Sequence, residues 1–243
     1  MIELEAVSKY YGHVRALDRM TVRVKPGATT VLMGSSGCGK STALRLMIGL
    51  IQADRGRVLF GGQPLSSDNI LDVRRRMGYV IQDGGLFAHL SAGDNIALSA
   101  RYLGWDEGRV EPRLKELADL VQLRPSSLAL YPVELSGGQR QRVSLMRAMM
   151  LEPEVLLLDE PLGALDPIIR NELQYQLRSI FRELEQTVVL VTHDVAEASF
   201  FGDHLVLLRG GEVVQQGDIR ELLDNPAEPF VSRFISAQRR SVT

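Results

Sequence analysis

Short, nearly continuous apolar runs recur along the chain, separated by stretches in which apolar residues follow a helical spacing. The apolar runs are Thr30–Met33, Met77–Ile81, Val155–Leu158 and Val188–Val191. Such runs are typical of strands that are covered on both faces, as in a parallel sheet. Their alternation with helices predicts an α/β domain with a largely parallel sheet.

Two of the helical stretches have a recognisable start. Lys40–Leu50 follows soon after the first apolar run. Asp166 and Pro167 have the form of a helix N-cap followed by a proline at the first helical position. The helix that they open has an apolar face made of Leu173, Leu177, Ile180, Phe181 and Leu184.

Other segments depart from this alternation. In the segment 83–151 one helical pattern follows another, which predicts a helical insertion in the α/β core. Val22–Val24 and Arg57–Phe60 suggest an antiparallel flank. The segment 204–215 has the pattern of a β-hairpin with two glycines at its turn. We expect a short helical tail from Asn225 onward.

The composition is that of an ordinary globular protein, with 45% apolar and 24% charged residues among 243. A formal charge of -2 argues against general nucleic-acid binding. The single cysteine, Cys38, cannot form an internal disulfide. The start of the chain has no apolar signal stretch, and the best candidate span, 43–51, is too short and contains Arg45. We therefore expect a soluble, cytoplasmic protein that would serve a membrane only through a partner.

The first candidate site is the glycine-rich segment GSSGCGKS at 34–41, between a predicted strand and a predicted helix. It matches G-x-x-x-x-G-K-[ST], in which glycines let backbone amides close around phosphate oxygens. Lys40 would add a charge at the β- and γ-phosphates, and Ser41 would offer a hydroxyl to Mg²⁺. Lys40 and the helix N-terminus also favour a thiolate at Cys38, which we expect to be reactive.

The run VLLLDE at 155–160 supplies acidic residues that would complete such a site. A buried strand here would deliver Asp159 to its carboxyl end, where ligands of open α/β sheets bind. Asp159 would hold Mg²⁺ directly or through water, and Glu160 could polarise an attacking water. Alone, the run would be weak support. Together with the glycine-rich loop it indicates a nucleoside-triphosphate hydrolase.

A second candidate anion site is LSGGQRQR at 135–142. A serine and two glycines precede a predicted helix, whose N-terminus carries the positive end of its dipole. The segment has no lysine and no metal ligand that resembles those of the first site. It therefore has the character of half of a composite site.

The order of the glycine-rich loop, LSGGQ, VLLLDEP, ALD and a strand ending in THD resembles an ABC transporter ATPase over the whole chain. The resemblance implies a P-loop NTPase cassette with a RecA-like, mostly parallel sheet. It implies one domain, 1–243, with core and β flank at 1–84 and 152–224, a helical subdomain at 85–151 and a tail at 225–243. In that family two cassettes pair head to tail, and each ATP lies between one subunit's phosphate loop and the other's LSGGQ.

The resemblance also implies roles for individual residues, with ATP and Mg²⁺ as ligands. The ATP-binding residues would be Tyr11, Gly34, Ser35, Ser36, Gly37, Cys38, Gly39, Lys40, Ser41 and Thr42. The signature residues Leu135, Ser136, Gly137, Gly138 and Gln139 would face the partner's ATP, and Asp166 would organise the facing site. The metal ligands would be Ser41, Gln82 and Asp159, and the catalytic residues Glu160, His193 and Gln82.

For some of these residues a structural role is an alternative. Tyr10 competes with Tyr11 for stacking on adenine, and Asp166 also has the form of an N-cap. Arg140 and Arg142, on the signature helix, could simply form a solvated face.

The resemblance further implies separate permease subunits and a second ATPase subunit, as a homodimer or a pair with a close relative. By analogy it favours import, with the chain on the cytoplasmic side of the inner membrane. VIQDGGLFAHLSAGDNIAL, LGWD and YPVELSGGQRQR are most similar to the importers of quaternary amines such as glycine betaine, choline and carnitine, which work with a solute-binding protein. Leu86, Phe87 and His89, directly after Gln82, would contact the permease.

Alternatives to this assignment are import of amino acids or other small solutes, and a soluble ABC ATPase of DNA repair or translation. The chain has neither sustained heptads nor a second cassette, which argues against the soluble class. The chain ends soon after NPAEPFVSRF, without the paired CBS domains of some members, so the sequence does not predict ionic-strength sensing through such domains.

Overall fold

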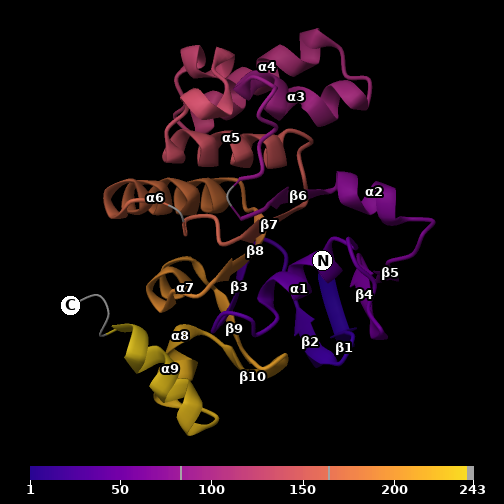
Figure 1. Ribbon diagram of the computed structural model, residues 1–243, viewed down its shortest axis with the longest axis vertical. Helices are drawn as coiled ribbons and strands as arrows, with labels where there is room; N and C mark the ends of the chain where they lie inside the picture. Colours follow the sequence, from indigo (N-terminus) through magenta and orange to yellow (C-terminus); the bar gives the residue numbers. More distant parts are fainter. Residues whose placement is uncertain (83, 164, 240–243) are drawn as a thin grey trace. The chain divides into compact units, whose positions relative to one another are not determined.

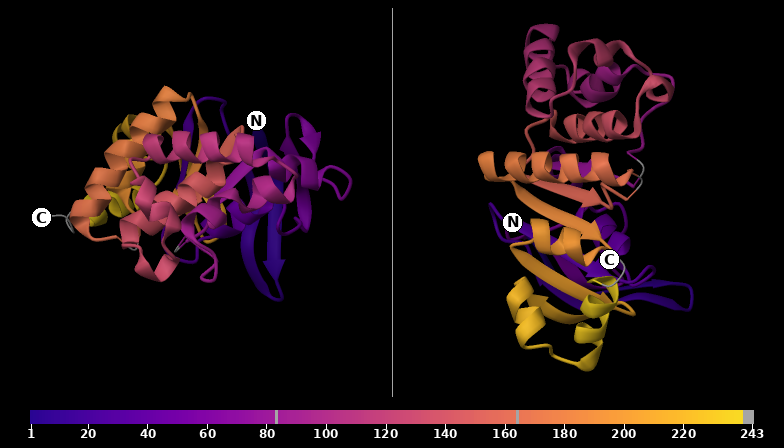
Figure 2. Two further views of the ribbon diagram at one scale, coloured as in Figure 1. Left: turned by 90° about the horizontal axis from the view of Figure 1, so that it is seen from above. Right: turned by 90° about the vertical axis from the view of Figure 1, so that its left-hand side faces the viewer.

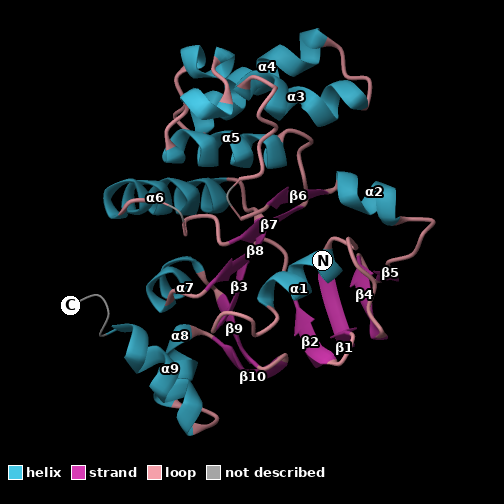
Figure 3. Ribbon diagram, in the orientation of Figure 1, coloured by secondary structure: helices cyan, strands magenta, loops and turns pink. Residues whose placement is uncertain are grey.

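The computed structural model describes residues 1–82, 84–163 and 165–239. Residues 240–243 of the predicted tail lie outside this part of the chain. The chain divides into two compact units, one made of Met1–Arg74 with Glu185–Thr243 and the other of Arg75–Leu184. Both contain helices and strands (Figure 3).

An antiparallel sheet in the order β2-β1-β4-β5 forms the flank of the first unit (Figure 1). Its strands are β1 (Ile2–Tyr11), β2 (Val14–Arg23), β4 (Arg55–Phe60) and β5 (Gln63–Pro64). The sequence predicted the flank from parts of β2 and β4, and the structure confirms it. The two strands do not pair with each other, because β1 lies between them.

The parallel strands β3 (Thr29–Gly34) and β8 (Thr187–Thr192) of the first unit are fully buried, as their apolar sequences predicted. β3 pairs in parallel with β8 and β9 (His204–Arg209). β9 and β10 (Glu212–Gly217) form the predicted hairpin. Since β3 and β8 are parallel neighbours, the residues that follow them emerge at the same edge.

Helix α1 (Lys40–Met47) contacts both the antiparallel flank and the parallel strands. It ends three residues before the predicted end at Leu50. Gly49 has a φ of 67°, in the left-handed region, and a Cβ there would collide with Ile70. The other helices of this unit are α2 (Ile70–Arg75), whose last residue falls beyond the boundary, α7 (Val195–Phe201), α8 (Ile219–Asp224) and α9 (Pro229–Arg239).

In the second unit, β6 (Met77–Val80) pairs in parallel with β7 (Val155–Asp159). Long helix α6 (Pro167–Glu183) follows, and the predicted apolar residues Leu173, Leu177, Ile180 and Phe181 are buried along it. The prediction was wrong for Leu184, which lies just past the end of the helix and is 46% exposed.

The predicted series of helices in this unit is α3 (Ala92–Tyr102), α4 (Glu107–Leu120) and α5 (Gly137–Met149), with short 3-10 turns at Pro125–Ala129 and Pro132–Glu134. The three α-helices pack against one another, and Figure 2 shows them from two further directions. Within residues 1–82, 84–163 and 165–239, none of the helices has both the length and the apolar character that crossing a membrane requires.

Candidate functional site

The glycine-rich loop leaves the carboxyl end of β3 and enters α1, as predicted. Gly34, Gly37 and Gly39 have φ values of 150°, 78° and 108°, all of which favour glycine. A Cβ on Gly34 would collide with the Leu208 carbonyl, and one on Gly39 would lie 2.6 Å from the Ala16 carbonyl. Gly34 and Gly39 are therefore required both by backbone conformation and by the close approach of neighbouring strands, whereas Gly37 is required by its backbone conformation.

Lys40 lies at the first position of α1, and only 5% of it is exposed. Its ammonium donates hydrogen bonds to the Gly34 carbonyl at 2.8 Å and the Ser35 carbonyl at 3.1 Å. These bonds hold a positive charge inside the curve of the loop. Ser41, the predicted metal ligand, comes next and is half-buried.

Cys38 corrects one prediction from the sequence. The residue is 3% exposed, and its sulfur lies 4.0 Å from the Lys40 Nζ atom. Burial raises the pKa of the Cys38 thiol, and the nearby Lys40 charge only partly offsets this. The expectation of a reactive thiolate is therefore wrong, because desolvation outweighs the lysine.

We predict that native Cys38 is alkylated by iodoacetamide more slowly than the same thiol in the unfolded chain at pH 8, because burial raises the pKa of the thiol and so lowers the thiolate fraction. Labelling should accelerate as the pH rises further, because the thiolate is the reactive form. Mass spectrometry of timed samples, with denatured protein as the control, measures both. Equal rates in the native and unfolded chains would contradict the buried position.

His193 follows β8 at the edge of the sheet at which β3 ends. Met33 and Thr192 are register partners on the adjacent strands β3 and β8. The glycine-rich loop begins one residue after Met33, and His193 is the residue after Thr192. His193 is exposed. The structure therefore brings this predicted catalytic residue and the phosphate loop to the same edge of one unit.

Tyr11 ends β1 and pairs with Val14 at the turn of the flank. It is 47% exposed, and the Lys9 ammonium lies 5.8 Å from the centre of its ring. Tyr10 is less exposed, at 36%, and its amide donates to Asp54. Both tyrosines thus retain an accessible face, and the choice of Tyr11 for adenine stacking stays a prediction.

In the second unit, the acidic residues of VLLLDE occupy the carboxyl end of β7. Asp159 is the last residue of the strand and is 4% exposed. Because Leu158 is in register with Val80 of β6, the segment with Gln82 leaves the sheet at the same edge. Gln82 is exposed. Asp159, Glu160 and Gln82, predicted from separate motifs, are thus grouped along this edge.

Glu160 adopts a backbone conformation that the sequence did not reveal. Its φ is 48°, in the left-handed region, which costs a residue with a Cβ about 1 kcal/mol or more. The turn is closed by a hydrogen bond from the Gly163 amide to the Glu160 carbonyl at 3.2 Å. Strained residues of this kind concentrate at functional sites, where the surrounding structure fixes them.

The signature segment forms the N-terminus of α5, as predicted. Ser136 is the N-cap residue: its hydroxyl accepts from the Gln139 amide at 3.2 Å, and its own amide donates to the Gln139 side chain at 2.8 Å. Leu135 and Gly138 are buried, and a Cβ on Gly138 would lie 2.7 Å from Ile169. Ser136 stays exposed at the helix N-terminus, where an anion would be stabilised.

The two arginines of the signature helix make specific contacts. Arg140 donates to the Leu135 carbonyl at 2.5 Å and so braces the loop before Ser136. Arg142 donates to the Gln122 carbonyl at 2.9 Å and pairs with Glu172. These bonds contradict the alternative that Arg140 and Arg142 only form a solvated face.

Asp166 caps α6, as one of its two predicted roles required. Its Oδ1 atom accepts from the amides of Ile168 and Ile169, both at 3.1 Å. The carboxylate is exposed. The predicted role across a dimer remains open.

Sequence reasoning missed a set of side chains that hold the segment after Gln82. Arg147 of α5 donates to the carbonyls of Gly84 and Gly85, both at 2.8 Å, and Ser144 donates to Gly84 at 2.9 Å. Asn95 of α3 is fully buried and bonds to both backbone groups of Phe87. The sequence signal that could have revealed Asn95 is a polar residue among the apolar positions of a helix, here between Ala92 and Ile96.

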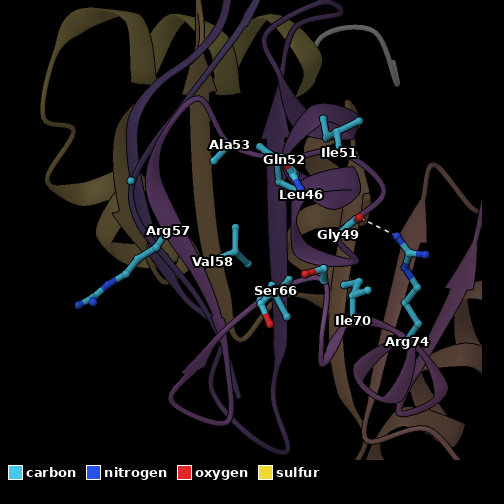
Figure 4. Close-up of a pocket in the computed structure, with 13 residues that line it drawn as sticks. Leu46, Gly49, Ile51, Gln52, Ala53, Arg57, Val58, Ser66, Ile70 and Arg74 are labelled. Atoms are coloured by element: carbon cyan, nitrogen blue, oxygen red, sulfur yellow. Dashed lines mark hydrogen bonds between the residues drawn. The ribbon is translucent and has the colours of Figure 1, made fainter.

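A cavity of about 390 Å³ opens in the first unit beside α1, β4 and α2 (Figure 4). Its lining residues all fall between Leu46 and Arg74, so it is separate from the glycine-rich loop. Arg74 donates to the Gly49 carbonyl at 2.6 Å, whereas the Arg57 side chain points away from the cavity. The two arginines therefore do not form an anion site there.

The strand, glycine-rich loop and helix with a buried lysine define the nucleotide-binding loop of P-loop proteins. A sequence profile described as ABC transporter matches residues 17–163. The chain is 44% identical over 242 residues to the glycine betaine uptake system ATP-binding protein YehX of Escherichia coli (strain K12), across 100% of this chain and 79% of that protein. It is 42% identical over 240 residues to the glycine betaine/carnitine/choline transport ATP-binding protein OpuCA of Bacillus subtilis (strain 168). That alignment covers 98% of this chain and 63% of the relative's length.

The fold is also similar to a solved structure, the dimeric structure of a post-hydrolysis state of the ATP-binding cassette MJ0796 bound to ADP and Pi. The TM-score is 0.81 with 31% sequence identity, over 90% of this chain and 99% of that chain. The resemblance seen in the sequence is thereby confirmed, and the chain belongs to the ABC transporter family.

Proposed function

We propose that this chain is the ATP-hydrolysing subunit of an importer of a quaternary amine, of the kind to which glycine betaine, choline and carnitine belong. The observation that carries the ATPase assignment is the loop of positive-φ glycines around the buried Lys40 ammonium. Import and the class of solute are supported by the names of the relatives, two of which are transport proteins for these compounds.

For nucleotide binding, the amides of the glycine-rich loop and the Lys40 ammonium would hold the phosphates, and Tyr11 would stack on adenine. The proposed metal ligands are the Ser41 hydroxyl of the first unit and, from the second unit, the Asp159 carboxylate and the Gln82 amide oxygen. All three are hard oxygen ligands, which fit Mg²⁺. When bound, Mg²⁺ would neutralise charge on the β- and γ-phosphates.

For hydrolysis, Glu160 would act on the attacking water, because it carries a carboxylate next to the metal ligand Asp159 and is held in a strained turn. His193 would contact the γ-phosphate from the edge that it shares with the glycine-rich loop. Gln82 would contact the water or the metal. Each of these three residues would therefore either orient a reacting group or accept a proton.

The signature helix would bind the ATP of a second copy of the chain. The exposed N-cap Ser136 offers a hydroxyl and helix amides, but the signature segment has no lysine like Lys40, so it would complete a site rather than form one alone. The dimeric cassette structure that this fold resembles supports such pairing.

We predict that Ser136→Arg blocks ATP-driven pairing and lowers ATPase turnover by ~10-fold or more while leaving nucleotide binding to the monomer intact, because its bulk would fill the surface that receives the partner's phosphates. ATP titration of the monomer and sedimentation with MgATP separate the two effects. Ser126→Arg, at an exposed site in the same unit, is the control. Unchanged pairing and turnover in Ser136→Arg would contradict the composite site.

The solute can be tested in cells. A strain that lacks this chain should lose energy-dependent uptake of labelled glycine betaine or choline, and wild-type protein should restore it where Lys40→Ala does not. If uptake of these amines is unchanged and that of another small solute is lost, the solute class is wrong. Stimulation of the purified ATPase by DNA or ribosomes, and not by membrane subunits, would contradict the transport role.

The segment after Gln82 would contact the permease. Phe87 is 46% exposed and His89 is exposed, so the Phe87 ring is accessible to a partner. The two rings lie edge-to-face, with their centres 6.1 Å apart. We predict that a cross-linking residue at position 87 reacts with a cytoplasmic loop of the permease in native membranes. The same group at exposed Tyr175 serves as the control. Cross-links confined to the C-terminal tail would contradict the assignment.

A further inference from the structure

A set of hydrogen bonds links the residues on either side of His193. The Thr192 hydroxyl donates to the Glu197 carboxylate at 2.6 Å and accepts from the Asp194 amide at 3.0 Å. The Asp194 carboxylate in turn accepts from the amides of Ala196 at 2.7 Å and Glu197 at 3.3 Å. The residues before and after His193 are thereby linked to each other and to the first turn of α7.

The centre of this network is buried although His193 itself is exposed. Thr192 is 2% exposed and Glu197 is 5% exposed. Burying a carboxylate is costly unless hydrogen bonds compensate for its lost hydration. The Thr192 hydroxyl can make both hydrogen bonds in only one orientation, since it donates to Glu197 and accepts from Asp194. The network therefore fixes the direction in which the chain leaves β8.

The network also connects His193 to the phosphate loop. Thr192 is in register with Met33, and Gly34 follows Met33 as the first residue of the glycine-rich loop. Helix α7 contacts both β3 and β8. A shift of the Thr192–Asp194 backbone would therefore move the imidazole relative to a phosphate held by the loop.

We propose that Thr192 and Glu197 are positioning residues for ATP hydrolysis, which hold His193 at the distance and angle that the γ-phosphate requires. The proposal rests on the proposed role of His193. Neither residue needs to contact ATP, because both act through the backbone around His193. A displacement of about 1 Å can cost a reaction up to ~10²-fold in rate.

Thr192→Val tests the proposal, because valine keeps the shape and the strand preference but removes both hydrogen bonds. We expect kcat of the full chain to fall ~10-fold or more, with the Kd for MgATP changed less than ~2-fold. Thr192→Ser, which restores the hydroxyl, should recover most of the rate. Thr187→Val is the matched control at the other end of β8, where the buried hydroxyl accepts from the Gly27 amide.

A double-mutant cycle with His193→Ala separates positioning from a general effect on the fold. If Thr192 acts through His193, Thr192→Val should cost nothing further once the imidazole is absent. The proposal would be overturned if Thr192→Val lowered kcat equally with and without His193→Ala. It would also be overturned if Thr192→Val alone kept the full rate. A full rate in His193→Ala would instead show that the proposed role of His193 is wrong.

Glu197→Gln provides a second test if Thr192→Val lowers the yield of folded protein. The amide keeps the volume and an acceptor oxygen but removes the charge, so the bond from Thr192 should weaken. The expected kcat lies between those of wild type and His193→Ala, again with little change in the Kd for MgATP. A rate loss that is independent of His193, or no loss, would overturn the proposal here too.

Discussion

Lys40→Ala should raise the Kd for MgATP by about 10²-fold, the largest effect on binding that we expect from one side chain. Its ammonium is buried inside the loop and is held by two carbonyls, and a charge-assisted hydrogen bond contributes ~1.5–3 kcal/mol. Removing it takes away the cationic side chain that the glycine-rich loop offers to the phosphates. Titration with a fluorescent ATP analogue measures the loss.

Two variants make the Lys40 result specific. Lys40→Met keeps most of the buried volume and should lose affinity to the same extent, because the charge is what matters. Lys25→Ala, at an exposed position of the same unit, should bind normally. Normal affinity in Lys40→Ala would show that the glycine-rich loop is not the phosphate site.

Glu160→Gln should lower the rate of ATP hydrolysis by roughly 10²–10⁴-fold, the range expected when a general base is lost. The amide keeps the size of the side chain and a hydrogen-bonding group. Binding should survive, since Lys40, Ser41 and Asp159 are unchanged. Single-turnover hydrolysis of radiolabelled ATP measures the rate, and Glu185→Gln, which changes an exposed glutamate with a similar positive φ, is the control. Hydrolysis at nearly the normal rate would remove Glu160 from the catalytic role.

The buried strands could be predicted from sequence because the cause of their structure is local. β3, β7 and β8 are continuous apolar runs, and such runs have few alternatives in a soluble domain. The motif residues were found for a similar reason. A loop that encloses phosphate needs glycines and a lysine at fixed spacing, and this spacing can be recognised directly in the amino-acid sequence.

Features that depend on contacts between distant segments could not be predicted. The position of β1 at the centre of the flank follows from pairing with both β2 and β4, which local alternation does not specify. The need for a glycine at position 49, just after the end of α1 at Met47, depends partly on the approach of Ile70. The burial of Cys38, which reversed the expected direction of its pKa, is a property of the folded chain that the local sequence does not show.

The network around His193 illustrates the same limit. THD was recognised as a motif, but Thr192 and Glu197 lie five positions apart, and only the fold shows that they share a hydrogen bond. The hydrogen bonds that Arg147 and Asn95 make to the segment after Gln82 are of the same kind. In both cases the sequence identified the group that would touch the ligand, and the structure identified the side chains that hold it.

The central claim is that two copies of this chain enclose ATP between the glycine-rich loop of one and the signature helix of the other. The most direct measurement is the mass and nucleotide content of Glu160→Gln in MgATP, by size-exclusion chromatography with light scattering. We expect a dimer with two bound ATP molecules, which should be absent with MgADP and absent when Ser136→Arg is added. A monomer at saturating MgATP would contradict the central claim.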